Sequence, residues 1–169
     1  MVITAVWPLP IVTSTLAISK ILGWEYFEKL GQQQIMQVQS AVEPPRKVVQ
    51  GERPVMVDGA EASAFQLQQG GGAISLIYPS EGTPAVPLNG VLMKEAPHPN
   101  AARLFMNFLY SREAQQIFVD YGFRSLHPEV KEPAGRKPLG EIKLLRTDPE
   151  EQEKANEDIK ARYAKYFGT

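Results

Sequence analysis

Apolar side chains recur with a helical period in several parts of the chain. From Leu16 to Leu30 they form one stripe, the hydroxyl residues 13–15 suit an N-cap, and Gly31 suits a helix end. Residues 149–167 begin at a proline and have an acidic first turn and a basic last turn, as the helix dipole favours. Together these signals predict helices at residues 15–30, 43–51, 60–69, 100–110, 112–121 and 149–167.

Shorter apolar or alternating runs separate these helices and predict strands. Residues 35–40 alternate apolar and polar side chains, as a half-buried strand does. The remaining strands are expected at residues 54–57, 73–78 and 86–93. Pro87 interrupts the last of these runs and weakens it as a strand. Short strands that alternate with helices indicate an α/β fold.

Composition narrows the class of protein. The 169 residues are 43% hydrophobic with a net charge of −1, which indicates a globular protein and gives no electrostatic reason to expect nucleic acid as a partner. There is no cysteine, so disulfides and thiolate metal sites are excluded. No apolar run reaches the roughly 18 residues of a membrane span. Residues 1–22 lack the basic start and cleavage site of a signal peptide, so we expect none in this chain.

Two segments in the middle of the chain carry a recognisable pattern. Residues 78–84 read YPSEGTP, and residues 94–116 read KEAPHPNAARLFMNFLYSREAQQ, a turn followed by two helices that break at Ser111. This order resembles the C-terminal half of an extracellular solute-binding protein of an ABC importer, nearest to the ferric-iron-binding type. In that family the first segment returns the chain between two lobes, and the second packs on the first lobe.

The resemblance covers about residues 13–130. Residues 22–30 (LGWEYFEKL) resemble a helix end of the family, and residues 46–55 (RKVVQGERPV) resemble its helix-to-strand join. The resemblance implies a periplasmic-binding-protein type II fold, with most of the second lobe and only the late helices of the first lobe, so that the two-lobe protein is incomplete. It divides the chain into an atypical segment at 1–12, a second-lobe α/β domain at 13–78, inter-lobe return strand and helices at 79–130, and a charged loop with a C-terminal helix at 131–169.

This organisation leaves apolar helix faces without the sheet that would cover them. Exposed apolar patches of this kind drive association. We therefore expect the chain to self-associate through these helices. The residues concerned are Leu104, Phe105, Phe108, Leu109, Ile117, Phe118 and Tyr121.

The resemblance also indicates where a ligand would bind. The family holds its ligand between lobes that close by a hinge. One binding device is a helix N-terminus, whose free N–H groups attract anions. Ser14 and Thr15 supply hydroxyls at the predicted helix start, which suits ligand binding; alternatively, they only cap the helix.

A second candidate group surrounds the strand-to-helix turn at residues 57–63. Asp58 and Glu61 suit a cationic or hydroxyl-rich ligand or a metal; alternatively, Asp58 caps the helix and Glu61 is solvated near its positive end. Tyr78 ends a predicted strand and suits either ligand contact or hinge packing. Ferric-binding relatives place adjacent tyrosines near this turn, but this chain has no tyrosine pair, which puts iron in doubt, and we expect no metal site.

The resemblance implies capture of a small solute in the periplasm and its delivery to an ABC permease in the membrane, with no cofactor and no catalytic residue. Two alternatives stay open. One is a small hydrolytic enzyme in which Asp58 and Glu61 share a helix face as an acid/base pair. The other is a protein-interaction module built around the charged C-terminal helix.

Overall fold

The computed structural model describes residues 1–4 and 9–168 and divides into two packed units. The first unit comprises Met1–Val86 with Ile142–Thr169, and the second unit comprises Pro87–Glu141. Helices dominate both units and the strands are short. The protein is therefore a helix-rich chain of mixed α and β structure, in agreement with the predicted α/β class.

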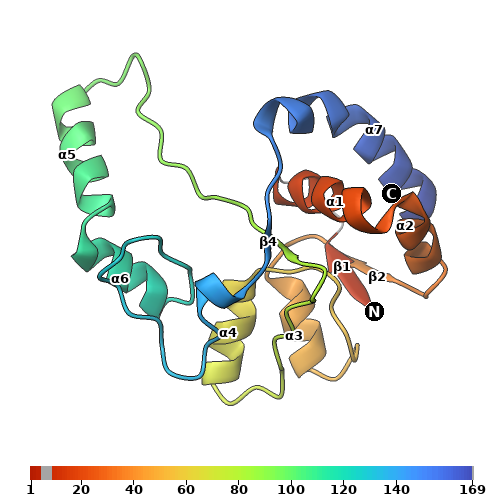
Figure 1. The fold of residues 1–169 in the computed structure, drawn as a ribbon. Helices are drawn as coiled ribbons and strands as arrows, with labels where there is room; N and C mark the ends of the chain where they lie inside the picture. The colour runs from red at the N-terminus through yellow and green to blue at the C-terminus, as the bar shows by residue number, and fades with distance from the viewer. Residues whose placement is uncertain (5–8, 169) are drawn as a thin grey trace. The chain divides into compact units, whose positions relative to one another are not determined.

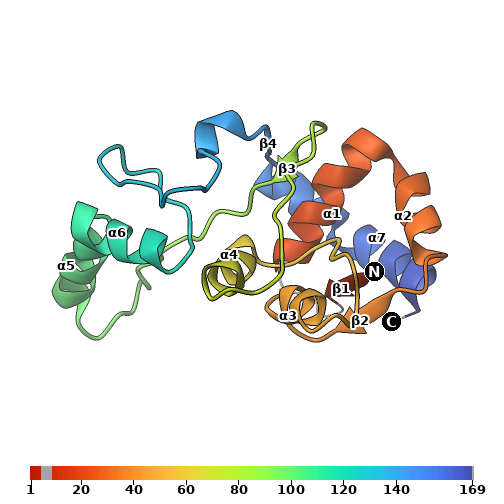
Figure 2. The same cartoon turned by 90° about the horizontal axis from the view of Figure 1, so that it is seen from below.

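The first unit contains two short parallel strands. β1 (Val2–Thr4) pairs with β2 (Met36–Val38), and Val2 also bridges to Met56. That bridge is the part of the predicted strand at 54–57 that forms in the described structure. Figures 1 and 2 show the strands between two groups of helices. Coverage of both faces is the usual condition for parallel strands, because their side chains are apolar on both sides.

Three helices of the first unit pack on one another to form one of these groups. They are α1 (Leu9–Leu22), α2 (Trp24–Gly31) and α7 (Pro149–Phe167). Val12 of α1 and the fully buried Ile159 of α7 belong to one apolar cluster at their contact. Removing such side chains from water supplies most of the stability of a helix in a protein.

Helix α7 occupies the predicted residues 149–167 because its start and stop signals are local. Asp148 is the N-cap, and its carboxylate accepts hydrogen bonds from the backbone N–H groups of Glu150 (3.0 Å) and Glu151 (3.1 Å). Gly168 takes the left-handed conformation after the last turn, with φ of 71°, which glycine adopts without strain. These signals lie within the sequence of the helix itself, so no distant contact is needed to find it.

The other group of helices in the first unit is formed by α3 (Glu43–Val49) and α4 (Glu61–Gln69), as predicted from the prolines and glycines around them. α3 also contacts β1. A second parallel pair of strands joins distant parts of the chain, β3 (Thr83–Pro84) and β4 (Leu144–Leu145). This pairing attaches the end of the segment 78–84 to the C-terminal part of the unit.

The predicted single helix at 15–30 is wrong at its start and in its middle. In the part of the chain that the structure describes, the helix begins at Leu9. It is broken at Gly23, whose φ is 71°, so that two helices, α1 and α2, form. Ser14 and Thr15 therefore lie inside α1, where the backbone N–H groups already serve the helix. The hydroxyl run is compatible with a helix interior here because neighbouring apolar residues pack on α7, and tertiary packing overrides the weak preference of Ser and Thr for caps.

Two segments predicted as strands are irregular in the described structure. In residues 73–78 the buried Ile74 is held by a side chain, because Gln68 Nε2 donates to the Ile74 carbonyl over 3.1 Å. Residues 86–93 also lie outside any strand. An apolar run becomes a strand only where a partner strand supplies hydrogen bonds, and the sequence pattern does not reveal that partner.

The second unit is organised around a pair of helices, α5 (Pro99–Leu109) and α6 (Arg112–Asp120), with a short 3₁₀ helix, η1 (Leu139–Glu141). The helices at 100–110 and 112–121 are confirmed. Ser111 separates them and caps α6, because its hydroxyl accepts from the backbone N–H of Ala114 over 3.3 Å.

Arg136 anchors the loop of the second unit to the end of α6. Its guanidinium donates to the carbonyls of Gly122 (2.6 Å) and Phe123 (2.9 Å), and it pairs with Glu132 at 3.4 Å. The Arg136 side chain is only 1% exposed. A cation is favourable at this place because carbonyl groups at a helix C-terminus carry partial negative charge.

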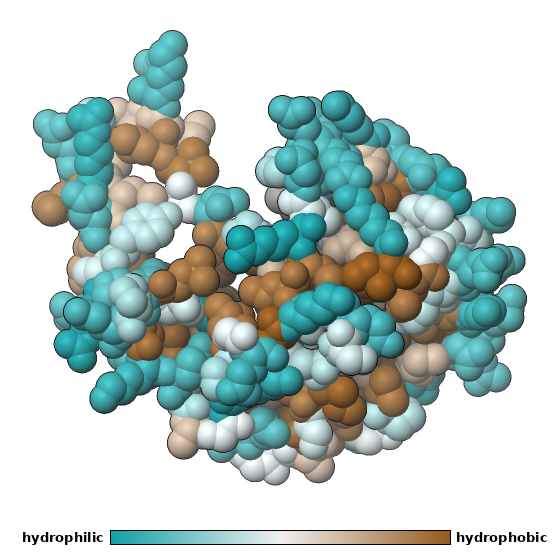
Figure 3. Space-filling view, viewed as in Figure 1, coloured by the Kyte–Doolittle hydropathy of each residue, from teal (hydrophilic) through white to brown (hydrophobic). Residues whose placement is uncertain are grey.

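Apolar side chains remain exposed on the second unit. None of the residues of α5 is buried within the described structure, and Leu104 of that helix is 72% exposed. Apolar atoms are visible at the molecular surface in Figure 3. Six of the seven residues expected to form an apolar patch are exposed by more than a third: Leu104, Phe105, Phe108, Ile117, Phe118 and Tyr121.

Candidate functional site

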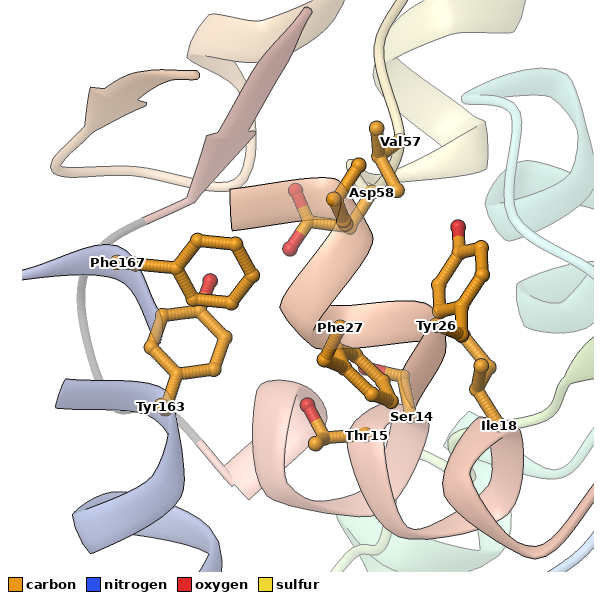
Figure 4. A pocket seen from close by; sticks show the side chains of 10 residues that line it. Ser14, Thr15, Ile18, Tyr26, Phe27, Val57, Asp58, Tyr163 and Phe167 are labelled. Carbon is orange, nitrogen blue, oxygen red and sulfur yellow. The ribbon is translucent and has the colours of Figure 1, made fainter. Parts of the chain in front are cut away.

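Side chains of the first unit surround a small cavity (Figure 4). Its volume is about 30 Å³, which is room for about one water molecule. Helices α1, α2 and α7 and the loop before α4 provide the lining. The lining residues are Ser14, Thr15, Ile18, Tyr26, Phe27, Leu30, Val57, Asp58, Tyr163 and Phe167.

The polar groups of the cavity are one carboxylate and four hydroxyls. Asp58 supplies the carboxylate, and Ser14, Thr15, Tyr26 and Tyr163 supply the hydroxyls. Three of the five predicted site residues are therefore brought to one cavity. Hydroxyls both donate and accept hydrogen bonds, whereas an ionised carboxylate only accepts them. The cavity is therefore richer in acceptors than in donors.

Aromatic rings form much of the remaining wall. The rings of Tyr163 and Phe167, one helical turn apart on α7, lie 4.5 Å apart between centroids. Tyr26 and Phe27 of α2 meet edge to face at 5.2 Å. Figure 4 shows the Asp58 carboxylate directed toward the rings of Tyr163 and Phe167. The carboxylate therefore lies near aromatic rings. The faces of these rings carry partial negative charge and their edges carry partial positive charge.

Both tyrosine hydroxyls of the cavity hold their protons more firmly than a free phenol. Burial raises the pKa of Tyr163 well above its ordinary value, and the negative charge of Asp58 raises it further. The same two causes raise the pKa of Tyr26, with burial again the larger. The ionised form of each phenol would lose hydration and face a second negative charge. At neutral pH the cavity therefore carries two neutral hydroxyls beside one carboxylate group.

Backbone hydrogen bonds on both sides of Asp58 fix its position. The N–H of the preceding Val57 donates to the carbonyl of Val2 in β1 over 3.1 Å. Two residues after Asp58, the N–H of Ala60 donates to the carbonyl of Ala41 over 3.0 Å. The carboxylate therefore extends from a loop that is attached to the sheet at one end and to the start of α3 at the other.

Ser14 and Thr15 reach the cavity from a different position than the sequence predicted. They lie within α1, and the Ser14 hydroxyl donates to the carbonyl of Ile11 over 3.1 Å. The neighbouring Thr13 hydroxyl donates to Gln152 of α7 over 2.8 Å. A helix interior offers no free N–H groups, so the predicted anion site at a helix N-terminus is wrong. What these residues offer to the cavity is hydroxyl groups alone.

Glu61 and Tyr78 form a separate pair. The Tyr78 hydroxyl donates to Glu61 Oε1 over 2.6 Å, and both side chains are half-buried. Glu61 lies in the first turn of α4, where the helix dipole favours a negative charge. Neither residue lines the cavity around Asp58. The five predicted site residues thus fall into two groups.

The contribution of α7 to the cavity was not predicted. The spacing of Tyr163 and Phe167, four residues apart, places both rings on one helical face, but this pattern alone indicates only that the helix docks on the rest of the protein. Tyr26, within the segment 22–30 that resembles the family, was expected in the buried stripe of the first helix and not at a binding site. The signal that could have found these residues is the clustering of aromatic side chains on the inner faces of two helices.

A larger groove lies elsewhere in the first unit, on the surface between α3 and α4. Its volume is about 370 Å³, and Arg46, Ser63 and Gln66 provide its polar side chains beside Val42, Val49 and Leu67. Arg46 is exposed. A single exposed cation over a mixed surface is common, and this groove does not include any of the five predicted site residues.

The part of the chain that the structure describes contains no group of three or more His, Cys, Asp or Glu side chains placed to hold a metal ion. Within the same residues, none of the helices is both long enough and apolar enough to cross a membrane.

The sequence profile of the bacterial extracellular solute-binding proteins matches residues 11–124, more than half of the chain. The protein therefore belongs to this family. Members of the family are generally binding proteins without enzymatic activity, and an extracellular family indicates a periplasmic or extracellular location. No curated protein and no solved structure matches the chain. The matched segment includes Asp58 and Tyr26, whereas α7 with Tyr163 lies outside it.

Proposed function

We propose that the protein acts as a substrate-binding component of an ABC-type importer, which captures a small solute without chemistry and presents it to a membrane permease. The observation that carries the proposal is the family match over residues 11–124. The same proposal includes a location in the periplasm and a fold of the periplasmic-binding-protein type II. The resemblance to ferric-binding relatives contributes no iron site, since the sequence has no adjacent tyrosines.

Binding without chemistry requires only that the solute favours one conformation over another. A solute shifts the equilibrium by its difference in affinity for the two states, and closure by a hinge is one way to create that difference. The cavity around Asp58 holds about one water molecule. In this state it therefore admits one functional group of a solute, and the remainder of the solute must lie outside it.

We assign the contact with the solute to Ser14, Thr15 and Asp58 at the cavity, and propose Glu61 with Tyr78 as a second polar group for a larger ligand. The 2.6 Å hydrogen bond between the Tyr78 hydroxyl and Glu61 supports a fixed orientation of that pair. A ligand that reaches both groups would satisfy more of its own polar atoms than one confined to the cavity, and unpaired polar atoms are costly when buried.

The geometry gives little support to the two alternative functions. An acid/base pair has to face one reacting group, but Asp58 lines the cavity and Glu61 does not. An interaction module built on α7 would have only the charged outer face of this helix to offer, because its apolar residues Ile159 and Tyr163 are buried in the first unit. Both residues serve the core on which the cavity depends.

A panel of solutes tests the proposed function. We expect at least one member of a panel of amines, oxyanions, organic acids, sugars and metal ions to raise the melting temperature of the purified protein and to bind in isothermal titration. Asp58→Asn should weaken that binding, and the exposed Asp120→Asn serves as a matched control for the loss of one charge. Hydrolysis of a panel member by the protein, or no binding by any of them, would contradict the proposal.

The partner and the self-association also have tests. If the protein serves an importer, reading frames for a permease and an ATPase should neighbour its gene, and a cross-linked complex with that permease should depend on bound solute. We also propose that the exposed apolar side chains of α5 and α6 mediate self-association. A protein that remains monomeric at high concentration would contradict this second part without affecting solute binding.

A further inference from the structure

Resting on the proposed function, we propose that the solute is an organic amine and that the cavity around Asp58 holds its ammonium group. The cavity combines one carboxylate with four hydroxyls and several aromatic rings. Lys, Arg and His do not occur among its described lining residues. The lining therefore has the charge and the acceptors that suit a cation.

An ammonium group fits the polar atoms of the cavity better than an oxyanion does. It donates three hydrogen bonds and accepts none. The side chains of Asp58, Thr15 and Tyr163, which carry one carboxylate and two hydroxyls, all line this cavity (Figure 4). An oxyanion would find only hydroxyl donors there and would be repelled by the carboxylate, since like charges in a partly buried site are weakly screened.

The aromatic walls favour the same class of ligand. Cations are attracted to ring faces, and this attraction is stronger where water is excluded. Phe27, Tyr163 and Phe167 each present a ring at the cavity (Figure 4), and the first two are almost fully buried. The hydroxyls of Tyr26 and Tyr163 are neutral at neutral pH, as phenols ordinarily are, and their lone pairs can accept a hydrogen bond from the ligand.

The volume sets the size of the group that enters. About 30 Å³ is enough space for one water molecule, and an ammonium group has a similar size. Asp58 and Tyr26 are half-buried, so this side of the cavity approaches the surface. The alkyl part of the amine would leave on this side. A primary ammonium group is therefore expected to bind better than a quaternary one, which is too large.

Helix α7 would set part of this specificity. Its rings of Tyr163 and Phe167 lie beside the carboxylate (Figure 4), outside the segment 11–124 that matches the family. The loop with Asp58 lies inside that segment. The charge that attracts the cation thus comes from the family's own segment, and the C-terminal helix adds two rings to those of Tyr26 and Phe27.

The test compares butylammonium with neutral and anionic probes on the full chain. In isothermal titration and thermal shift, butylammonium should bind, tetramethylammonium should bind more weakly, and 1-butanol and sulfate should not bind. Asp58→Asn should reduce affinity for butylammonium by roughly tenfold or more, a loss of one charged partner. Asp120→Asn should leave it unchanged, because that carboxylate is exposed in the second unit.

The outcomes distinguish a failure of the amine assignment, a failure of the proposed location and a failure of the proposed function. Binding of sulfate, a sugar or an organic acid without binding of amines would overturn the amine assignment and leave the proposed function intact. Equal binding by wild type and Asp58→Asn would overturn the location. Binding by no solute of any class would contradict both. If Asp58→Asn does not fold, two other measurements replace it. Tyr163→Phe should weaken the binding of butylammonium. In the wild type, the NMR signal of the Ile18 methyl groups should shift when butylammonium is added.

Discussion

The two units of this protein use apolar side chains in opposite ways. Of the buried hydrophobic residues in the described structure, only Ala114 and Val119 belong to the second unit. In the first unit, α1, α2 and α7 join across the whole length of the sequence and bury large side chains such as Ile159. In the second unit, α5 and α6 have amphipathic sequences, yet Leu104 and Phe105 stay in contact with solvent.

This difference shows that an amphipathic pattern predicts a helix but not what covers it. A helix face is buried only if the chain supplies a second surface. The first unit has such surfaces, and its cavity is one consequence of the packing of α7 against α1 and α2. The second unit buries few apolar side chains, has polar links such as those of Arg136, and retains an apolar surface that is suited to association.

The largest expected effect comes from truncating the core of the first unit. Ile159→Ala should lower the free energy of unfolding by about 2–5 kcal/mol, because a fully buried side chain leaves a cavity among Val12 and Leu16. The matched Leu104→Ala on α5 should change it by no more than about 0.5 kcal/mol, since that side chain is 72% exposed. Urea unfolding followed by circular dichroism measures both. Similar losses would contradict the contrast between the units.

Loss of the polar anchor should destabilise the second unit specifically. Arg136→Met should cost about 2–4 kcal/mol, because the carbonyls of Gly122 and Phe123 lose a charged donor and Glu132 loses one of two arginine partners. Hydrogen exchange should accelerate in the second unit and stay unchanged in α1 and α7. Arg103→Met, at an exposed site on α5, is the control and should have no such effect.

The buried tyrosines predict a loss of stability in alkali. Folding raises the pKa of Tyr163 and Tyr26 above the value of about 10 for an unfolded chain. Their contribution is therefore complete below about pH 10 and is lost as pH rises above it, because the unfolded state releases these protons first. Tyr163→Phe should flatten the fall in melting temperature above that pH, and Tyr121→Phe at an exposed ring should not. An unchanged slope in Tyr163→Phe would contradict the burial of this hydroxyl.

A substitution on the exposed face of α5 should have the smallest effect on stability. The same substitution should have the largest effect on self-association. Leu104→Glu should lower the apparent mass in sedimentation velocity while the melting temperature stays nearly constant, because charge opposes contact between apolar surfaces. Ile77→Glu, at a site in the first unit that is 85% exposed, tests whether the loss of any exposed apolar side chain reduces self-association. If both variants or neither change the association, the apolar face of the second unit is not responsible.

The sequence predicts those parts of the fold whose signals are local. The helix at 149–167 has its cap at Asp148 and its stop at Gly168, so its bounds follow from neighbouring residues. The break at Gly23 was missed because the apolar stripe continues through it. Strands at 73–78 and 86–93 were wrong because pairing depends on partners far away; the observed strands pair Val2 with Met36 and Thr83 with Leu144.

The candidate site shows the same limit. Asp58 was selected from its turn, and Ser14 and Thr15 from a helix start that does not exist; the cavity that unites them results from tertiary packing. Tyr163 could not be assigned to this cavity from the sequence, because α7 meets α1 across contacts such as Thr13 to Gln152, 139 positions apart. The sequence therefore predicted some of the polar residues of the site, but not that they would line one cavity.

Hydrogen exchange in the presence of butylammonium tests most directly whether the first unit carries the binding site. Saturating ligand should slow exchange in α1, α2, α7 and the loop around Asp58, and leave α5 and α6 unchanged. The same protection should be absent in Asp58→Asn. Protection confined to Pro87–Glu141, or no protection anywhere in the wild type, would contradict the account.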